Sequence, residues 1–181
     1  MLDKAIRYDT IIAVSALLIS ALTSAAVVYQ THVISAQFSA TVWPYLSFAV
    51  TRDTSHLVVE LRNDGIGPAL IRSVGITLDG KRVPSLNTIV DPIVAEATRS
   101  HKDHETRSTV SSLETGTVVP ANEHVTLVQV EGAQATQLLL AAASRVNMSI
   151  CYCSLLGRCW TKQFDDRTGQ PHDTASCREA E

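Results

Sequence analysis

The cysteines are the residues whose types and spacing most directly suggest chemistry in this sequence. Cys151, Cys153 and Cys159 lie in the stretch ICYCSLLGRCW at 150–160, and Cys177 follows near the C-terminus. Cysteines this close together can ligate a metal, form a redox centre or form disulfides. The choice depends on the cellular compartment, because disulfides persist outside the reducing cytosol.

The spacing of these cysteines favours disulfides. In a strand, Cys151 and Cys153 project from the same face. Gly157 can supply a turn between Cys153 and Cys159, which suits a disulfide that closes a hairpin loop. Cys151 is then left for Cys177, although four cysteines allow three pairings and the sequence excludes none. Zinc sites normally use two close ligand pairs, and thioredoxin-type sites use C-x-x-C. We therefore predict structural disulfides, with a metal site and free thiols as alternatives.

A second group that could do chemistry is the polar stretch SHKDHE. His101, Asp103 and His104 could hold a metal ion on one helical turn, which gives an alternative function as an envelope metal-binding protein or enzyme. Two such histidines on an exposed segment are more often solvated. The sequence contains no G-x-S-x-G, P-loop or H-E-x-x-H motif. We expect a protein that is not an enzyme and that has no metal or cofactor.

An uncharged apolar segment near the N-terminus is the strongest organisational signal. Residues 11–29 read IIAVSALLISALTSAAVVY. As a helix this segment covers about 28 Å, close to the hydrocarbon thickness of a bilayer. Its Ile, Leu and Val residues together favour insertion by roughly 3 to 5 kcal/mol, which outweighs the small cost of the hydroxyl residues. The segment predicts a transmembrane helix.

The flanking charges predict how this helix is oriented. Lys4 and Arg7 precede the segment, and the next basic residue is Arg52. The positive-inside rule then leaves residues 1–10 in the cytoplasm and the rest outside it, so we expect a single-pass protein of the inner membrane with a periplasmic domain. A signal peptide cleaved near Ser24–Ala26 is the alternative, but the apolar run is longer than a usual signal core.

Small residues recur along the predicted membrane helix. Ala16, Ser20 and Ser24 follow one another at intervals of four positions. Such a stripe lets two helices approach closely, so these residues are candidates for a helix–helix interface, either in self-association or with another membrane subunit.

The region after the anchor has the pattern of a β-rich domain. We expect the helix to continue to about residue 42, because the residue before Pro44 is displaced from helical geometry. Apolar alternation and turn signals then predict about seven short strands. They are YLSFAV (45–50), HLVVELRN (56–63), LIRSVGITLDG (70–80) with its return KRV, GTVVP (116–120), HVTLVQV (124–130), and a terminal hairpin of VNMSICYC and RCWTKQF (146–164).

Helical insertions interrupt this series of strands. The polar excursion 84–112 is expected to be part helical, and GAQATQLLLAAASR at 132–145 is rich in strong helix formers. Short strands without a strand–helix alternation favour an immunoglobulin-like antiparallel β-sandwich over residues 43–166. Residues 167–181 are expected to form a C-terminal tail.

Several of these motifs together resemble a group of uncharacterised bacterial membrane-anchored proteins. The motifs are TVWPYL, LRNDGIGPALIRSVGITLDG and YCSLLGRCW, which span residues 41–160 in that order. The resemblance implies a single N-terminal anchor followed by an extracytoplasmic β-rich domain of immunoglobulin-like type. It implies no activity and no functional residues.

Composition and charge narrow the function further. The chain has 181 residues, a net charge of −3 and 5% aromatic residues, which gives neither the basic excess nor the aromatic surface of a nucleic-acid-binding protein. With no catalytic motif, the expected function is binding: an accessory or assembly subunit that contacts the membrane and another envelope protein. The excursion 84–112 and the loop at Gly65–Pro68 are the expected contact surfaces.

Overall fold

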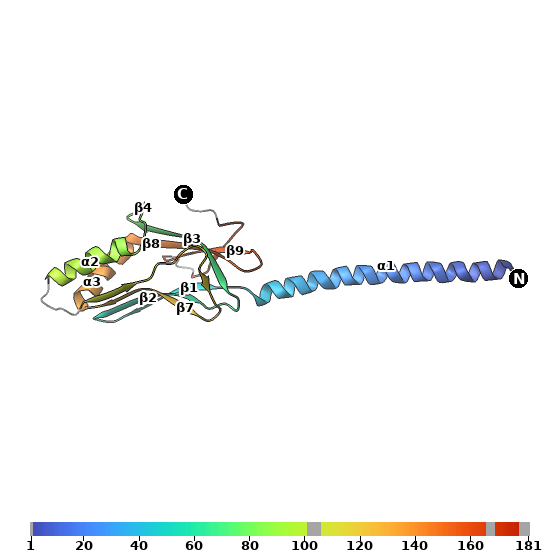
Figure 1. Ribbon diagram of the computed structural model, residues 1–181, viewed down its shortest axis with the longest axis horizontal. Coiled ribbons are helices and arrows are strands. Elements are labelled where there is room, and N and C mark those ends of the chain that lie inside the picture. The colour runs from blue at the N-terminus through green and yellow to red at the C-terminus, as the bar shows by residue number, and fades with distance from the viewer. Residues whose placement is uncertain (1, 101–105, 166–168, 178–181) are drawn as a thin grey trace. The chain divides into compact units, whose positions relative to one another are not determined.

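The computed structural model describes residues 2–100, 106–165 and 169–177 (Figure 1). The chain divides into a helical unit that ends at Thr41 and a second compact unit that begins at Val42. Each unit is described separately below.

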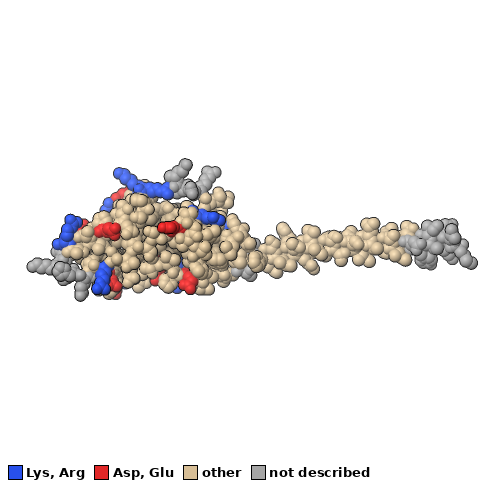
Figure 2. Space-filling view, in the orientation of Figure 1, with Lys and Arg blue, Asp and Glu red and all other residues tan. Residues whose placement is uncertain are grey.

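The helical unit is a single long helix, α1 (Leu2–Thr41). Its stretch Thr10–Phe38 is 29 residues long and contains an 18-residue window with a mean hydropathy of 2.4, none of whose residues is buried. Figure 2 shows no charged side chain on this stretch. The hydroxyls of Ser15 and Thr31 donate to the carbonyls of Ile12 and Val27 at 2.9 and 2.8 Å. These bonds satisfy the hydroxyls within the helix, which suits an apolar environment. Such a helix is typical of a signal anchor or a signal peptide.

The second unit contains two antiparallel sheets packed together. One sheet has the order β1-β2-β7-β5, and the other has the order β10-β9-β8-β3-β4, with β6 also paired to β3. The strands of the first sheet are β1 (Leu46–Arg52), β2 (His56–Asn63), β7 (His124–Glu131) and β5 (Arg107–Val110). Those of the second are β10 (His172–Thr174), β9 (Cys159–Gln163), β8 (Val146–Cys153), β3 (Ala69–Leu78), β4 (Lys81–Arg82) and β6 (Val118–Val119).

Apolar side chains from both sheets form the core. Leu61 and Leu127 of the first sheet and Ile150 of the second are almost completely buried. Tyr152 of β8 is also buried, and its hydroxyl oxygen accepts a hydrogen bond from the backbone N–H of Leu46 in β1 at 3.2 Å. Burial raises the pKa of Tyr152, because the phenolate would lose its hydration. Tyr152 therefore ties the two sheets together in its neutral form.

Two helices lie against each other beside the sheets (Figure 1). They are α2 (Asn87–Ser100), which precedes β5, and α3 (Ala133–Ala142), which leads through a short 3₁₀ turn (Ala143–Arg145) into β8. Val90 and Ala97 of α2 and Ala135 and Leu139 of α3 are buried in the same core as the sheets. The helix predicted at 132–145 is confirmed, and the excursion 84–112 contains α2.

The predicted antiparallel β domain with helical insertions is confirmed at this level, but its described residues form ten strands rather than about seven. Sequence patterns missed β5, because RSTV is polar and lies at a sheet edge where only one face requires apolar residues. They also missed β10, which falls in the segment predicted as a tail. The β10 segment has no apolar pattern, because strand pairing with β9 and the nearby disulfide at Cys177, rather than core packing, hold it.

Candidate binding groove at an open sheet edge

One edge of the six-stranded sheet is only partly closed. β3 pairs with β8 along its length, from Leu70 to Leu78. On its other side it pairs with β6 only at Ala69 and Leu70, and with β4 only at Thr77 and Leu78. Among the residues that the structure describes, 72–75 of β3 therefore have a strand neighbour on one side alone, and we call them the open stretch.

The sequence itself limits the two short strands that flank the open stretch. β4 returns from β3 through the tight turn at Asp79 and Gly80, whose φ values are 51° and 75°. The N–H of Val83 still donates to the Ile76 carbonyl at 2.9 Å, but the next residue is Pro84, which has no N–H to continue the ladder.

The other flank ends at a turn. The N–H of Gly116 donates to the Ile71 carbonyl at 2.8 Å, and Gly116 has a φ of 93°. The N–H of Thr117 closes the turn by donating to the Glu114 carbonyl at 3.1 Å. Because of this turn the preceding segment, residues 111–115, leaves the edge of β3 instead of pairing with it.

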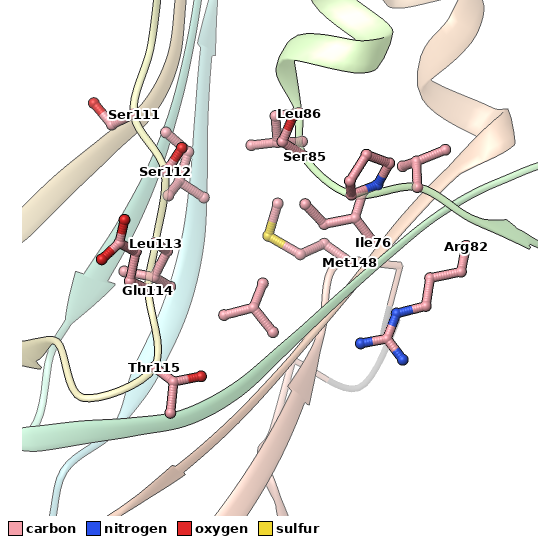
Figure 3. A pocket seen from close by; sticks show the side chains of 14 residues that line it. Ile76, Arg82, Ser85, Leu86, Ser111, Ser112, Leu113, Glu114, Thr115 and Met148 are labelled. Atoms are coloured by element: carbon pink, nitrogen blue, oxygen red, sulfur yellow. The ribbon is translucent and has the colours of Figure 1, made fainter. Parts of the chain in front are cut away.

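A cavity of about 390 Å³ lies between β3 and residues 111–115. Its apolar residues include Ile76 and Met148 of the six-stranded sheet and Leu127 of the four-stranded sheet. Figure 3 shows the Met148 side chain between residues 111–115 and β3, with Arg82 and Glu114 on opposite sides. We call this cavity the groove; its remaining lining residues are Val74, Val83, Pro84, Ser85, Leu86, Ser111, Ser112, Leu113 and Thr115.

The chemistry of the groove is that of a binding site. Its lining combines apolar side chains with the hydroxyls of Ser111, Ser112 and Thr115 and one charge of each sign. Among the described residues, no hydrogen bond joins the Glu114 carboxylate to any of these hydroxyls, so none of them has the paired base that activates a nucleophile. It can bury an uncharged, partly apolar ligand and hydrogen-bond to it.

A buried asparagine holds the end of the domain next to the groove. Asn63 is 1% exposed. Its Oδ1 accepts from the backbone N–H groups of Tyr45 and Gly65 at 3.1 Å each, and its Nδ2 donates to the carbonyls of Gly67 and Val119 at 2.8 and 3.0 Å. Val119 belongs to β6, so Asn63 also positions one flank of the open stretch. Sequence patterns did not single out Asn63, although its place before Asp64 and two glycines marked a turn.

The loop at Gly65–Pro68, predicted as a contact surface, packs closely inside the domain. The N–H groups of Ile66 and Gly67 donate to the Trp43 carbonyl at 3.1 and 3.2 Å. A Cβ atom on Gly65 would lie 2.5 Å from that carbonyl oxygen, and one on Gly67 would lie 2.1 Å from the Val42 carbonyl oxygen. The backbone of the loop therefore holds the first residues of the domain, while the Ile66 side chain is exposed.

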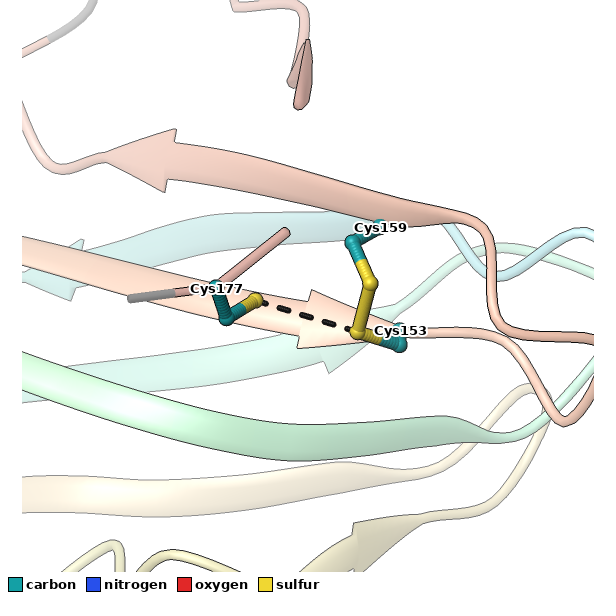
Figure 4. A group of neighbouring side chains, drawn as sticks. All are labelled: Cys153, Cys159 and Cys177. Carbon is teal, nitrogen blue, oxygen red and sulfur yellow. Dashed lines mark hydrogen bonds between the residues drawn. A yellow bond between two sulfur atoms is a disulfide. The ribbon is translucent and has the colours of Figure 1, made fainter. Parts of the chain in front are cut away.

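The four cysteines form two disulfides, as predicted. Cys151 is bonded to Cys177 and Cys153 to Cys159, which is the pairing that the spacing favoured. The Sγ atoms of Cys153 and Cys177 belong to different disulfides but lie 3.8 Å apart (Figure 4). Three of the sulfurs lie close enough together to suggest a metal site, but zinc needs thiolate ligands and these sulfurs are oxidised. The cluster is a covalent staple, and it supports an extracytoplasmic domain.

The remaining candidate residues are the histidine cluster and the small residues of α1. His101, Asp103 and His104 lie outside the described residues. Ala16, Ser20 and Ser24 are exposed along α1, as a helix–helix interface requires, and their use in such an interface stays a prediction.

No family model matches the chain, and no curated protein or solved structure matches it either. The resemblance to bacterial membrane-anchored proteins stays a prediction, and function has to be argued from the groove itself.

Proposed function

We propose that the protein is a membrane-anchored binding or assembly subunit, without catalytic activity, whose exported domain contacts another envelope protein through the groove. The observation that carries this proposal is the cavity of about 390 Å³ at the open edge of β3, lined from both sheets. Its volume falls within the range of roughly 300 to 1,000 Å³ that ligand sites occupy. The lining suits recognition rather than reaction.

The domain is placed in the periplasm, and α1 is retained as a single-pass anchor in the inner membrane. Two observations support this location: the exposed apolar stretch Thr10–Phe38, and two disulfides in the second unit. The test applies a membrane-impermeant alkylating reagent to intact cells, with and without prior reduction. The four cysteines should react only after reduction. Reaction that needs broken cells and no reductant would place the domain in the cytoplasm.

The architecture is inferred to be immunoglobulin-like. The order β1-β2-β7-β5 opposite β9-β8-β3 corresponds to the A-B-E-D and G-F-C sheets of an immunoglobulin constant domain, with β4, β6 and β10 as additions. In that correspondence β3 is strand C, the edge strand that a longer β4 would cover in variable-type domains. The similarity concerns the fold and carries no activity.

The contact is tested by photo-crosslinking in living cells. A photoreactive amino acid is placed at Ser112, which is exposed and lines the groove, and at Asp173, an exposed control on β10. Ser112 should give a crosslinked product of one defined mass that Asp173 does not give. Products absent at Ser112, or the same at both positions, would overturn the proposed contact.

A further inference from the structure

The open stretch of β3 leaves backbone groups directed at the groove. In an antiparallel pair, opposite residues alternate between exchanging both hydrogen bonds and exchanging neither. Because the N–H of Val83 donates to the Ile76 carbonyl from the β4 side, Ile76 faces away from β8. By the same alternation Val74 also faces away from β8, whereas Gly75 between them bonds to Ser149.

A β-bulge determines which residues of β3 direct their backbone groups toward the groove. Arg72 is an extra residue between Ile71 and Ser73, which are opposite consecutive residues of β8. Ile71 is already bonded on the side away from β8. The extra residue moves the alternation by one position, so that Val74 rather than Ser73 directs its N–H and C=O toward the groove.

Within the part of the chain that the structure describes, no hydrogen bond from the groove side reaches the N–H or C=O of Val74. The side chains of Val74 and Ile76 line the cavity, so these backbone groups border it. Backbone donors and acceptors at such a site are normally paired, either with water or with another polypeptide. The N–H and C=O of Val74 can both pair with an extended polypeptide backbone, because a strand presents an acceptor and a donor at the same spacing.

We infer that the open stretch receives an extended segment of the partner protein as an added β-strand. This inference rests on the proposed function and specifies how the partner is recognised. The open stretch covers residues 72–75, about 13 Å of strand at 3.3 Å per residue, so the added strand is about four or five residues long. β4 and β6 limit its length at the two ends.

The lining predicts the chemistry of that segment. Side chains directed inward would meet Ile76, Leu127 and Met148 and should be apolar, while those directed outward would meet the hydroxyls of Ser112 and Thr115. Arg82 and Glu114 on opposite sides favour a segment without net charge. Proline is excluded at the position that bonds to Val74, because it has no N–H.

The position of residues 111–115 favours a single segment over a second copy of this chain. These residues lie across the cavity from β3, so the strand must enter between two parts of the same domain (Figure 3). A flexible extended segment can enter there, whereas the edge of another folded sheet would first have to displace residues 111–115.

The first test measures amide hydrogen exchange in the full chain in detergent micelles by NMR. The Val74 amide should exchange at least about 100-fold faster than the neighbouring Gly75 amide, which bonds to β8. Val74 protected as strongly as Gly75 in the monomer would mean that the chain closes this edge itself, and would overturn the inference. Protection that appears only in a dimer would assign the edge to a second copy and would also overturn it.

The second test uses proline substitutions. Val74→Pro removes an N–H that bonds to no other described residue, so the ladder with β8 stays in place and only the packing of the Val74 side chain is lost. The thermal midpoint should therefore fall by no more than about 4 °C. Thr77→Pro is the matched control, because Thr77 pairs with Asn147 of β8 and the substitution breaks that ladder. The control should lower the midpoint by about 10 °C.

The Ser112 crosslink separates this inference from the proposed function. Val74→Pro should reduce the crosslink yield at least about ten-fold while the protein stays folded and membrane-bound, since one strand bond and its geometry are lost. A crosslink that persists in Val74→Pro would keep the partner but overturn strand addition. A wild-type protein with no crosslink at Ser112 would instead overturn the proposed function.

Discussion

The two edges of the six-stranded sheet are closed to different degrees. At one edge, β9 carries β10, and two disulfides connect Cys151 and Cys153 of β8 to Cys177 and Cys159. At the other edge, in the described part of the chain, β3 is flanked only by β4 and β6, each of two residues. One edge is held covalently, and the other leaves backbone groups available.

This difference suggests a division between stability and recognition. A free sheet edge invites pairing with other chains, so proteins normally cover it or interrupt it. Here the bulge at Arg72, Pro84 and the turn at Gly116 shorten the free edge to a few residues but do not remove it. An edge this short can accept one defined segment with little risk of extended aggregation. The disulfide-bonded edge contributes stability on the side of the sheet opposite the proposed contact.

The largest expected effect comes from Asn63, which positions the β6 flank of the open edge. Asn63→Ala should lower the free energy of unfolding by about 4 kcal/mol, because it leaves several buried backbone donors and acceptors without partners. Urea denaturation measures the change. Asp64→Ala, at the exposed neighbouring residue, removes only the exposed contacts with Ser47 and Arg62 and should cost no more than about 1 kcal/mol. Equal effects of the two substitutions would show that Asn63 does not hold this end of the domain.

Much of the fold followed from sequence because its strands carry strong local signals. HLVVELRN became β2 with the predicted bounds, and Asp79-Gly80 formed the predicted tight turn. The spacing of the cysteines favoured the observed pairing because a hairpin brings Cys153 and Cys159 opposite each other. These features depend on neighbours in the chain or on one strand pair.

The groove did not follow from sequence because it depends on non-local register. The bulge at Arg72 in the pairing with β8 decides whether the N–H and C=O of Val74 point toward β8 or toward the groove. No local sequence pattern reveals this bulge. The lining combines Val74, Ile76 and residues 82–86 with residues 111–115, Leu127 and Met148, which only the packing of the two sheets brings together. The clearest available signal was Pro84, which limits β4, but its meaning depends on knowing what β4 pairs with.

The second-largest effect should come from the covalent edge. Replacing Cys151 and Cys177 together by serine should cost about 3.5 kcal/mol of unfolding free energy, because that disulfide closes a loop with a sequence separation of 26 residues. Replacing Cys153 and Cys159, which are separated by 6 residues, should cost only about 2 kcal/mol. Both are measured by urea denaturation under oxidising conditions. A larger loss from the shorter loop would contradict the loop-closure explanation.

A third prediction concerns Tyr152 of β8, which connects the six-stranded sheet to β1 of the four-stranded sheet. Tyr152→Phe should cost about 2 kcal/mol, since the Leu46 N–H loses its buried acceptor. The raised pKa of Tyr152 means that the unfolded chain ionises first, near its ordinary value of 10.0. The contribution of Tyr152 to stability is therefore complete below pH 10 and is lost as the pH rises from there toward the folded-state pKa.

The pH dependence distinguishes this role of Tyr152 from simple packing. Urea denaturation between pH 8 and pH 11 should show a steeper fall in stability for the wild type than for Tyr152→Phe. Parallel slopes for the wild type and Tyr152→Phe would show that the phenol is not protected in the folded state.

The smallest effect, and the one most specific to the open edge, is expected from the Asp79–Arg145 pair. Arg145 donates to both carboxylate oxygens of Asp79 at the turn between β3 and β4, and these hydrogen bonds lower the pKa of Asp79. The pair therefore stabilises the fold above the ordinary Asp pKa of 3.8, and this contribution is lost as the pH falls through the folded-state value. Arg145→Gln should produce a slight loss of thermal stability at pH 7 that disappears in acid.

Amide hydrogen exchange tests whether the Asp79–Arg145 pair stabilises β4 at the end of the open stretch. Loosening the turn should accelerate exchange of the Val83 amide, whose bond to the Ile76 carbonyl is the last link between β4 and β3, and leave the Gly75 amide unchanged. Arg158→Gln is the matched control, because it removes an equally exposed ion pair with Asp173 at the disulfide-bonded edge. It should not affect the Val83 amide. If both substitutions accelerated Val83 exchange equally, the two edges would not behave independently, and recognition would not be separable from stability in this sheet.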